Sequence, residues 1–217
     1  MGRLVYVEGL IGAGKSTYTR EVGKRLNYRV FKEPVDKEHL DRFYTNPQGY
    51  AYQLQIHLLH KRIGIQQLAA CEALYSDAYA GALVDRSVFG DACFEAMHCE
   101  DGNISDLDHQ TYMCALNSMK LMLFPPTTLV FIDARPETCL ERIKARALVE
   151  DRPYESGITL DYLRRLQLHY KRLIKTARDG RWPWGHCIDV QHVQWDPVTR
   201  TEAEYDAVAS GLAEDWM

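Results

Sequence analysis

The sequence predicts a three-layer α/β/α domain, with helices on both faces of a five-stranded parallel sheet. Short apolar runs alternate along the chain with longer segments of helical periodicity. A glycine-rich loop follows the first apolar run, and charged residues follow the next three. This alternation favours a parallel sheet, because helices supply the crossovers between its strands. At 217 residues the chain suffices for one well-buried core, so we expect one domain over residues 1–217.

Each expected strand is a short apolar run that ends where a β-ladder stops. Pro34 follows the second run, and proline cannot donate a hydrogen bond to the ladder. Asp85, Arg86 and Ser87 close the third run. The five expected strands are Leu4–Val7, Tyr28–Phe31, Ala82–Val84, Thr128–Ile132 and Cys187–Val190.

The expected helices are bounded by capping and breaking residues. The longest runs from Pro47 to Ala80, where apolar residues recur at helical spacing and Gly81 supplies the stop. Ser105 with Asp108 resembles a capping box. The other expected helices run from Lys15 to near Asn27, over a short polar stretch after Pro34, from Ser87 to about His98, from Ser105 to before Pro125-Pro126, from Pro136 onward, from Thr159 to the turn at Asp179-Gly180, and at the C-terminus. A turn is expected at 100–103.

The bulk composition narrows the classes of function. Lys and Arg number 26 against 30 Asp and Glu, and this balance argues against binding nucleic acid over a broad surface. A small anionic ligand needs only a local cluster of positive groups. Six scattered cysteines without a CxxC pair predict free thiols in a reducing compartment. Because we see neither a leader nor an apolar run that could span a bilayer, we expect a cytoplasmic protein without a membrane partner.

The segment Gly9–Ser16 fits the pattern G-x-x-x-x-G-K-[ST] at every fixed position, between a strand and a helix. In such a loop backbone N–H groups surround phosphate oxygens, Lys15 bridges the β- and γ-phosphates, and the Ser16 hydroxyl ligates Mg²⁺. The residues expected to bind the donor nucleotide are Gly9, Gly12, Ala13, Gly14, Lys15, Ser16 and Thr17. A chance glycine turn is the weaker alternative. No Asn-Lys pair is present to form the base-reading motif of a GTP switch, whereas a regulatory ATP-binding module fits the same loop.

Charged residues at the ends of the other strands are the next candidates, since ligands of open α/β sheets bind beyond the carboxyl ends of the strands. Glu33 would be repelled by a γ-phosphate unless a substrate hydroxyl lies between them, which makes it the candidate base. Arg86 can neutralise the transferring phosphoryl group, and Asp85 can order the Mg²⁺ shell. A surface ion pair is the alternative for Glu33 and Arg86, and Asp133 is better explained as a cap for the helix at Pro136.

Two further groups have both a functional and a structural interpretation. Gln55, Leu58, Leu59 and Arg62 share one face of the long helix, which suits a nucleobase, although a helix-surface Gln is more often solvated. Arg142, Arg146 and Arg152 could form a lid over a triphosphate, or simply a solvated helix face. The polar stretch at 150–157 is expected to be mobile.

Several motifs together resemble those of the deoxyribonucleoside kinases. They are Glu8-Gly9 before the loop, Lys32–Val35, Tyr44–Pro47 with Leu54-Gln55, Asp85–Ser87 and Arg152–Ile158. The resemblance covers about residues 3 to 178. It looks closest to the deoxyadenosine/deoxyguanosine kinase branch of bacteria and some large DNA viruses, which shares the turn at Asp101–Asn103.

The resemblance implies a P-loop kinase fold with strand order 2-3-1-4-5, an arginine-rich lid at about 142–157 and a homodimer. It further implies Mg²⁺-dependent use of ATP to phosphorylate the 5′-hydroxyl of a deoxyribonucleoside, in nucleotide salvage. By this resemblance Glu33 is the base, with Arg86 and Lys15 as the other catalytic residues and Asp85 in the metal shell. The implied ligand contacts are Tyr44 and Glu155 at the sugar 3′-hydroxyl, Gln55, Leu58, Arg62 and Asp91 around the base, and Arg142, Arg146 and Arg152 in the lid.

The residues around the base favour a purine deoxynucleoside, with deoxycytidine next, because thymidine-preferring relatives carry apolar or small residues in place of Arg62 and Asp91. The chain departs from the family where Glu95 stands in place of an aromatic residue, with Phe94 as a possible substitute. The alternative enzyme is a nucleoside monophosphate kinase of the thymidylate kinase type. Its phosphate acceptor would be repelled by Glu33.

Overall fold

The computed structural model describes residues 2–147, 155, 157–181, 188–196 and 201–214. Five strands form one parallel sheet in the order β2-β3-β1-β4-β5, which confirms the predicted fold class and strand order. The strands are β1 (Arg3–Gly9), β2 (Tyr28–Phe31), β3 (Gly81–Asp85), β4 (Thr128–Asp133) and β5 (Asp189–Gln194).

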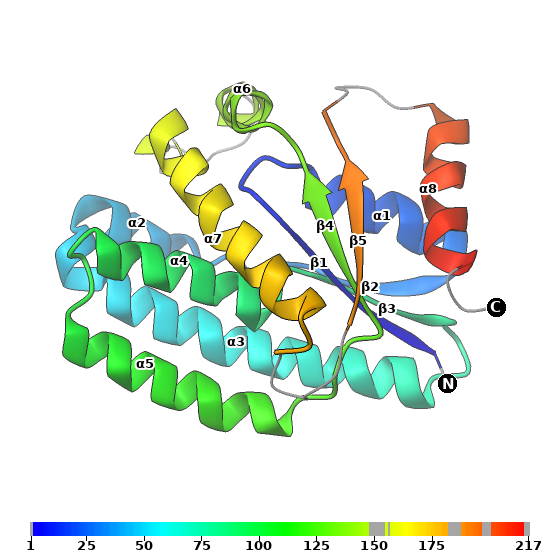
Figure 1. Cartoon of the computed structure of the whole chain (residues 1–217), viewed down its shortest axis with the longest axis horizontal. Coiled ribbons are helices and arrows are strands. Elements are labelled where there is room, and N and C mark those ends of the chain that lie inside the picture. The colour runs from blue at the N-terminus through cyan, green and yellow to red at the C-terminus, as the bar shows by residue number, and fades with distance from the viewer. Residues whose placement is uncertain (1, 148–154, 156, 182–187, 197–200, 215–217) are drawn as a thin grey trace.

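Helices cover both faces of this sheet and make it the middle layer (Figure 1). The helices are α1 (Lys15–Leu26), α2 (Lys37–Thr45), α3 (Pro47–Tyr75), α4 (Val88–Glu100), α5 (Asp106–Met119), α6 (Pro136–Ala147), α7 (Leu160–Arg178) and α8 (Glu202–Glu214). Helices α1 and α8 pack together on one face, whereas α3, α4 and α7 lie on the other, with α4 between α3 and α7 and α5 packed against α3 and α4. Helix α2 packs against α3 beyond the end of the sheet.

The central strand β1 shows why the sheet is buried on both faces. All seven of its residues are buried. Val5 and Val7 belong to one apolar cluster and Leu4 and Tyr6 to the other, as the two-residue period of a strand requires. Burial of each such side chain contributes about 1.5–3 kcal/mol, so β1 is a rigid support for the loop that follows it.

Side-chain caps start the helices where the sequence predicts them. The side chain of Ser105 accepts a hydrogen bond from the backbone of Asp108, and that of Thr159 does so from Tyr162. Ser87 caps α4, directly after β3 and the Asp85-Arg86 pair. These caps satisfy backbone N–H groups that a helix leaves unpaired at its start.

Two predicted elements have clearly different bounds in the structure. Helix α3 ends at Tyr75 rather than at Ala80, because Ser76 is extended and Gly81 already belongs to β3. A Cβ atom at Gly81 would lie 2.6 Å from the carbonyl oxygen of Arg3, so glycine allows close strand pairing here rather than stopping the helix.

Helix α5 ends at Met119 and gives way to a 3₁₀ turn at Lys120–Met122, before the two prolines, as expected. The second difference concerns a weaker signal. Strand β5 continues to Gln194, four residues beyond its predicted end at Val190, and the predicted start at Cys187 lies outside the described residues. At the edge of the sheet β5 is only half-buried, so its sequence lacks a continuous apolar run.

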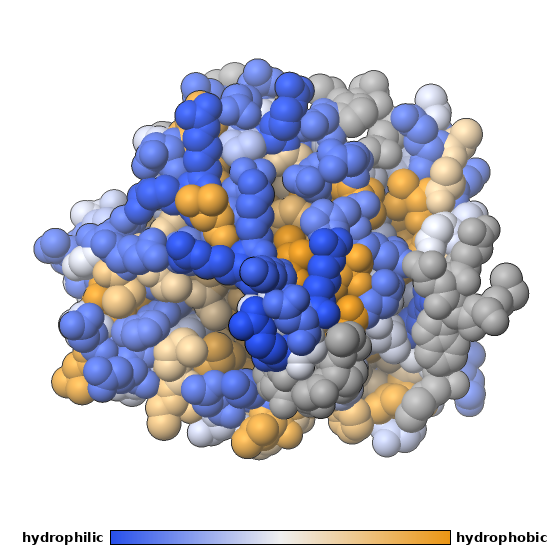
Figure 2. Space-filling model, in the orientation of Figure 1, coloured by the Kyte–Doolittle hydropathy of each residue, from blue (hydrophilic) through white to orange (hydrophobic). Residues whose placement is uncertain are grey.

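The surface matches that of an ordinary folded domain. On the face shown in Figure 2, hydrophobic residues are interspersed among hydrophilic ones and form no continuous band. Among the described helices, none combines the length and apolar character needed to cross a membrane. Cys71, Cys93, Cys99, Cys114 and Cys139 are free thiols, as expected, and Cys187 lies outside the described residues.

Candidate active site

The phosphate loop between β1 and α1 has the backbone conformation that its glycines predict. Gly12 and Gly14 have φ values of 77° and 101°, in the left-handed region that side chains other than glycine rarely adopt. A Cβ at Gly12 would lie 2.5 Å from the Cys139 carbonyl oxygen, and a Cβ at Gly14 would overlap the Trp195 ring. The loop therefore turns its backbone inward at the start of α1, where N–H groups and the helix dipole favour an anion.

Lys15, the first residue of α1, lies buried at the centre of this loop. Its Nζ donates to the carbonyl oxygens of Leu10 at 3.0 Å and Gly9 at 3.3 Å. Burial, assisted by the charge of Arg86, lowers the pKa of Lys15 to about 8, against the opposing effect of Glu33, Asp85 and Glu8. The negative charge of a triphosphate bound in the loop would favour the charged form of the Lys15 ammonium group.

Ser16 and Asp85 meet beside Lys15. The Ser16 hydroxyl donates to Asp85 Oδ2 at 2.7 Å. Asp85 is buried, and its other oxygen, Oδ1, has no hydrogen-bond partner among the described residues. Burial raises the pKa of Asp85, and Lys15 acts against this rise. A buried carboxylate oxygen without a donor, next to a hydroxyl, fits a hard cation such as Mg²⁺, which prefers oxygen ligands.

Glu33, after β2, is held by two arginines from other elements. Its Oε1 accepts from Arg86 Nε at 2.8 Å and from Arg62 Nη2 at 3.0 Å. Burial alone would raise the pKa of Glu33, but the charges of Arg86, Arg62 and Lys15 outweigh burial and hold this pKa well below its usual range. Glu33 is therefore an anion at neutral pH, and its position disfavours the surface ion pair as an explanation, because both arginine side chains are only 2% exposed.

Arg86 follows β3 in a conformation that costs free energy. Its φ of 68° is left-handed, which is uncommon for a residue with a side chain. The backbone N–H donates to Val7 at 3.0 Å, Nη1 donates to the Tyr170 hydroxyl, and the guanidinium carbon lies 4.7 Å from the centre of the Phe94 ring. The surrounding contacts thus fix the guanidinium between Glu33 and Tyr170.

A second buried acid, Glu8, supports this arrangement from β1. Its Oε1 accepts from the Ser87 backbone at 2.7 Å and from the Ser87 hydroxyl at 2.6 Å, and its Oε2 accepts from the Tyr170 hydroxyl at 3.2 Å. A Cβ at Gly90 would overlap the Glu8 carboxylate, so glycine is needed there. Glu8 and Tyr170 connect β1, α4 and α7 behind Arg86.

The residues expected around a base line one side of a cavity of about 980 Å³, which extends from the phosphate loop to α2 and α3. Gln55 and Arg62 are each 2% exposed, and Gln55 Oε1 and Arg62 Nη1 have no hydrogen-bond partner among the described residues. Arg62 Nε contacts Asp91, whose pKa is raised to about 6 by burial despite the charges of Arg62 and Arg86. The cavity is also lined by Tyr44, Leu58, Phe94 and Tyr162.

The polar atoms of this wall point to a ligand. A buried side-chain acceptor without a donor costs about 1–3 kcal/mol, and two unpaired groups in one cavity are explained most simply by a polar ligand between them. The solvated-helix interpretation of Gln55 is therefore wrong.

The lid arginines occupy two different positions. Arg142 Nη1 donates to the Ala13 carbonyl at 3.0 Å, and its Nη2 donates to the Trp195 carbonyl at 2.7 Å. Arg146 forms a two-pronged ion pair with Glu155 at 2.6 and 2.7 Å. Arg142, Arg146 and Glu155 all line the cavity. Arg152 lies outside the described residues.

Some predicted residues do not face the cavity. Gly9 and Ala13 shape the loop from behind: a Cβ at Gly9 would lie 2.8 Å from the Ile132 carbonyl, and Ala13 is fully buried. Asp133 accepts a hydrogen bond from Gln194 at 3.0 Å and stands outside the site. Glu95 points to His109 of α5, at 2.9 Å, so Phe94 is the aromatic residue of α4 in the cavity.

The sequence interpretation missed the roles of Glu8 and Tyr170. Glu8 was noticed only as part of the Glu8-Gly9 motif, although a charged residue inside an otherwise apolar strand is a signal of a buried network. Tyr170 continues the apolar stripe of α7 with Leu163, Leu166 and Ile174, which made it look like a core residue.

Comparisons with known proteins agree with this geometry. The sequence model described as deoxynucleoside kinase matches residues 5–211. A deoxyadenosine kinase of Dictyostelium discoideum is 34% identical over 212 residues, which cover 95% of this chain and 81% of that protein. A deoxyguanosine kinase of Lactobacillus acidophilus is 34% identical over 192 residues, which cover 86% of this chain and 76% of that protein.

A solved structure shares the fold at lower sequence identity. The deoxyadenosine kinase of M. mycoides with bound dATP has a TM-score of 0.77 and 22% identity, and the match covers 98% of this chain and all of that one. On the family match and the two curated relatives, the chain belongs to the deoxynucleoside kinase family, whose members phosphorylate deoxynucleosides.

Proposed function

We propose that this kinase transfers the γ-phosphate of ATP to the 5′-hydroxyl of a purine deoxyribonucleoside, with deoxycytidine as the next-best acceptor. The observation that carries the proposal is the asymmetry of Glu33. Both arginines contact Oε1, whereas Oε2 accepts no hydrogen bond from the described residues, and Glu33 lines the cavity with a side chain that is 31% exposed. A carboxylate held in this way can accept a proton from a neutral alcohol.

The same charge argues against a phosphorylated acceptor. An acceptor monophosphate beside Glu33 would bring two anions together, although Arg62 and Arg86 are close by. These cations are already matched by Glu33 and Asp91. A nucleoside avoids the repulsion, which favours a nucleoside kinase over a thymidylate-kinase-like enzyme.

In the mechanism that we propose, Glu33 Oε2 orients the 5′-hydroxyl and accepts its proton as the oxygen bonds to the γ-phosphorus and the bond to the β–γ bridging oxygen breaks. The transition state of phosphoryl transfer is loose, so the proton moves late and a carboxylate of low pKa is sufficient. Lys15 and Arg86 balance the charge of the transferring group.

We further propose that Ser16 and Asp85 would hold Mg²⁺, which would offset the negative charge of the donor phosphates. The unpaired Asp85 Oδ1 and the adjacent Ser16 hydroxyl supply oxygen ligands. Arg142, Arg146 and Arg152 are proposed as the lid, and Arg146 and Glu155 as a linked pair between the donor and the sugar.

The preference for a purine rests on the cavity wall and on the relatives. Gln55 offers an acceptor and a donor, and Arg62 offers a further donor, to a base edge. Relatives named deoxyadenosine kinase, deoxyguanosine kinase and deoxyadenosine/deoxycytidine kinase are 30–34% identical to this chain. We propose a role in nucleotide salvage and, from the family resemblance, a homodimer, which light scattering after gel filtration would test.

A panel of acceptors tests the substrate proposal directly. Deoxyadenosine, deoxyguanosine, deoxycytidine, thymidine and thymidine monophosphate are assayed with Mg-ATP at equal concentrations. We expect the highest kcat/KM for a purine deoxynucleoside, and no activity with thymidine monophosphate. If thymidine monophosphate is the preferred acceptor, the proposal is wrong and the protein is a nucleoside monophosphate kinase of the thymidylate kinase type.

The base assignment is tested by Glu33→Gln. The amide keeps the shape of the side chain but cannot accept the proton, so kcat should fall by about two to four decades with little change in nucleoside affinity. Glu38→Gln, on the exposed side of α2, is the matched control and should retain activity. A Glu33→Gln enzyme with a normal kcat would refute the role of Glu33 as base.

A further inference from the structure

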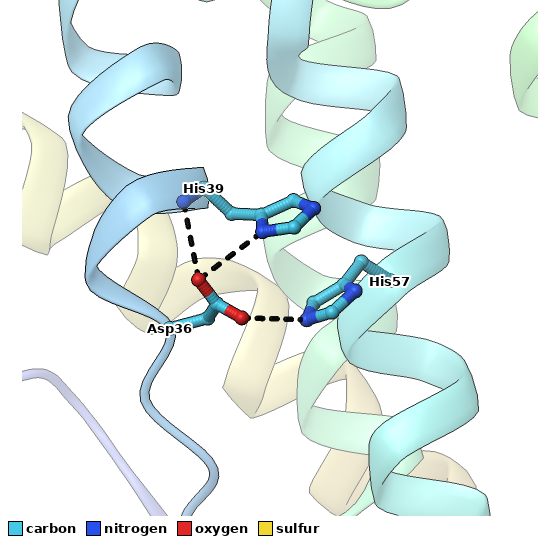
Figure 3. A group of neighbouring side chains, drawn as sticks. All are labelled: Asp36, His39 and His57. Carbon is cyan, nitrogen blue, oxygen red and sulfur yellow. Dashed lines mark hydrogen bonds and ion pairs between the residues drawn. The ribbon is translucent and has the colours of Figure 1, made fainter.

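Three potential metal ligands meet outside the phosphoryl-transfer machinery, at the point where α2 begins beside α3 (Figure 3). Asp36 is the N-cap of α2, His39 lies one turn later, and His57 belongs to α3. His39 Nδ1 is 3.1 Å from Asp36 Oδ1, and His57 Nε2 is 3.2 Å from Asp36 Oδ2. One ligand atom from each residue lies within 4.8 Å of the other two.

Two imidazole nitrogens are buried against the Asp36 carboxylate. His39 Nδ1 and His57 Nε2 lie at ion-pair distance from Asp36, but neither contact has the geometry of a hydrogen bond, and neither nitrogen has another partner among the described residues. The rings are stacked, with centres 3.9 Å apart, and both nitrogens face Asp36 (Figure 3). Two buried ring nitrogens therefore converge on one carboxylate without a well-formed hydrogen bond, as ligands of a shared cation would.

We propose that Asp36, His39 and His57 bind a divalent transition-metal cation of the Zn²⁺ class. Zn²⁺ bonds to histidine nitrogen and carboxylate oxygen at about 2.0–2.1 Å, so neighbouring ligands of one tetrahedral ion lie about 3.3 Å apart. The nitrogen–oxygen separations of 3.1 and 3.2 Å, each to a different oxygen of Asp36, are close to this spacing, and one ligand atom from each residue lies within 4.8 Å of the other two. Two nitrogen ligands exclude Mg²⁺ and Ca²⁺, which prefer oxygen.

A small rotation of one ring completes the site. The stacked rings must open slightly to direct both lone pairs to one ion, and the side chains are 25–37% exposed, so there is room to move. Lys61, whose charge acts on His57, opposes a cation. A site with three ligands and this repulsion should have a dissociation constant on the order of micromolar, weaker than a closed four-ligand structural site.

The ion would join α2 to α3 near the mouth of the cavity. Asp36 lines the cavity and lies three residues after Glu33, so the metal would fix the segment that connects β2 to α2. Its role is structural, because none of the three ligands contacts Glu33, Arg86 or Lys15 among the contacts of the described residues. The site is therefore independent of the proposed phosphoryl transfer.

Calorimetry on the full chain tests the site without any assay of activity. The protein is treated with a chelator, dialysed, and titrated with ZnCl₂ in a buffer free of nucleotide and Mg²⁺ at about pH 8. We expect one Zn²⁺ per chain at this site, with affinity lowered at least about tenfold in His39→Ala, His57→Ala and Asp36→Asn. His60→Ala is the control, since His60 lies on α3 but bonds only to the Ile56 carbonyl among the described residues, and it should bind as the parent does.

Co²⁺ provides a second measurement that separates this site from the free thiols. Its visible spectrum should show ligand-field bands without thiolate charge transfer, and His57→Ala should abolish them. Zn²⁺ should raise the Tm of the parent and of His60→Ala, but not of His57→Ala. The proposal fails if the parent binds no Zn²⁺ at tens of micromolar, if all four variants bind alike, or if the spectrum is that of cysteine ligation.

Discussion

The proposed donor and acceptor halves of the active site are built in different ways. The donor half is a continuous loop of backbone followed by α1, and its conformation is set by Gly12, Gly14 and their close neighbours. The acceptor half is assembled from side chains that follow β2 and β3 or project from α3 and α4. In this proposal, one half binds with main-chain groups that every residue carries, and the other binds with particular side chains.

This difference determines where specificity can arise. A loop of backbone N–H groups recognises any triphosphate, because phosphate oxygens are alike in all nucleotides. In the proposed acceptor site, the unpaired Oε1 of Gln55 and Nη1 of Arg62 would instead present a defined acceptor and donor to one base edge. Substitutions in the two halves should therefore change different kinetic constants, and three measurements test this separation.

The largest effect is expected from Lys15→Ala. Loss of the ammonium group removes charge stabilisation from the transferring phosphoryl, so kcat/KM for ATP should fall by about three decades. The KM for the nucleoside should remain within about twofold if the halves are separate. Lys175→Ala, an exposed lysine of α7, is the control, and a parallel loss of nucleoside affinity in Lys15→Ala would show that the halves are coupled through Glu33.

A smaller effect in the opposite half is expected from Gln55→Leu. A polar base edge would lose its partner at a buried position, which should raise the KM for the nucleoside by about 10–100-fold. The KM for ATP should not change. Gln53→Leu changes an exposed residue on the same helix and should leave both constants unaltered, whereas an unchanged nucleoside KM in Gln55→Leu would remove this residue from the base site.

The smallest effect concerns pH. Because burial, with Arg86, lowers the pKa of Lys15 to about 8, the ligand-free protein loses this positive charge as the pH rises from 7 to 9. Triphosphate binding favours the charged form, so affinity must fall as pH rises, by about tenfold over this range. Calorimetry with an unreactive ATP analogue measures the change, and Lys15→Arg should flatten it, since arginine does not titrate here. If affinity falls equally with pH in the parent and in Lys15→Arg, a group other than Lys15 is titrating.

Local sequence was sufficient to predict the conformation of the phosphate loop and most of the fold. The glycine spacing of the loop, the caps at Ser105 and Thr159 and the apolar strands act within a few residues, so their signals survive in the sequence. Glu33, Asp85 and Arg86 were found by their place after strands, and the structure brings them together around Lys15.

Long-range contacts explain what could not be predicted. The bond between Tyr170 and Glu8 joins residues 162 positions apart, and the apolar stripe of α7 gives no sign of it. Glu95 has the same problem, because its partner His109 lies on the next helix. The end of α3 was misplaced since Gly81 signals either a helix stop or a close strand, and only its neighbour Arg3 decides between them.

The contacts of Arg142 affect how far the chain can be shortened before the phosphate loop loses support. Its guanidinium donates hydrogen bonds to the carbonyls of Ala13, Trp195 and Asp196. The phosphate loop is therefore held in part by a segment almost 200 residues into the chain. A truncated gene product ending before Trp195 would keep every recognisable motif. It would still lose the hydrogen bonds through which Arg142 connects the phosphate loop to Trp195 and Asp196. Deletion mapping in this enzyme would thus mark the far end of the chain as part of the nucleotide site.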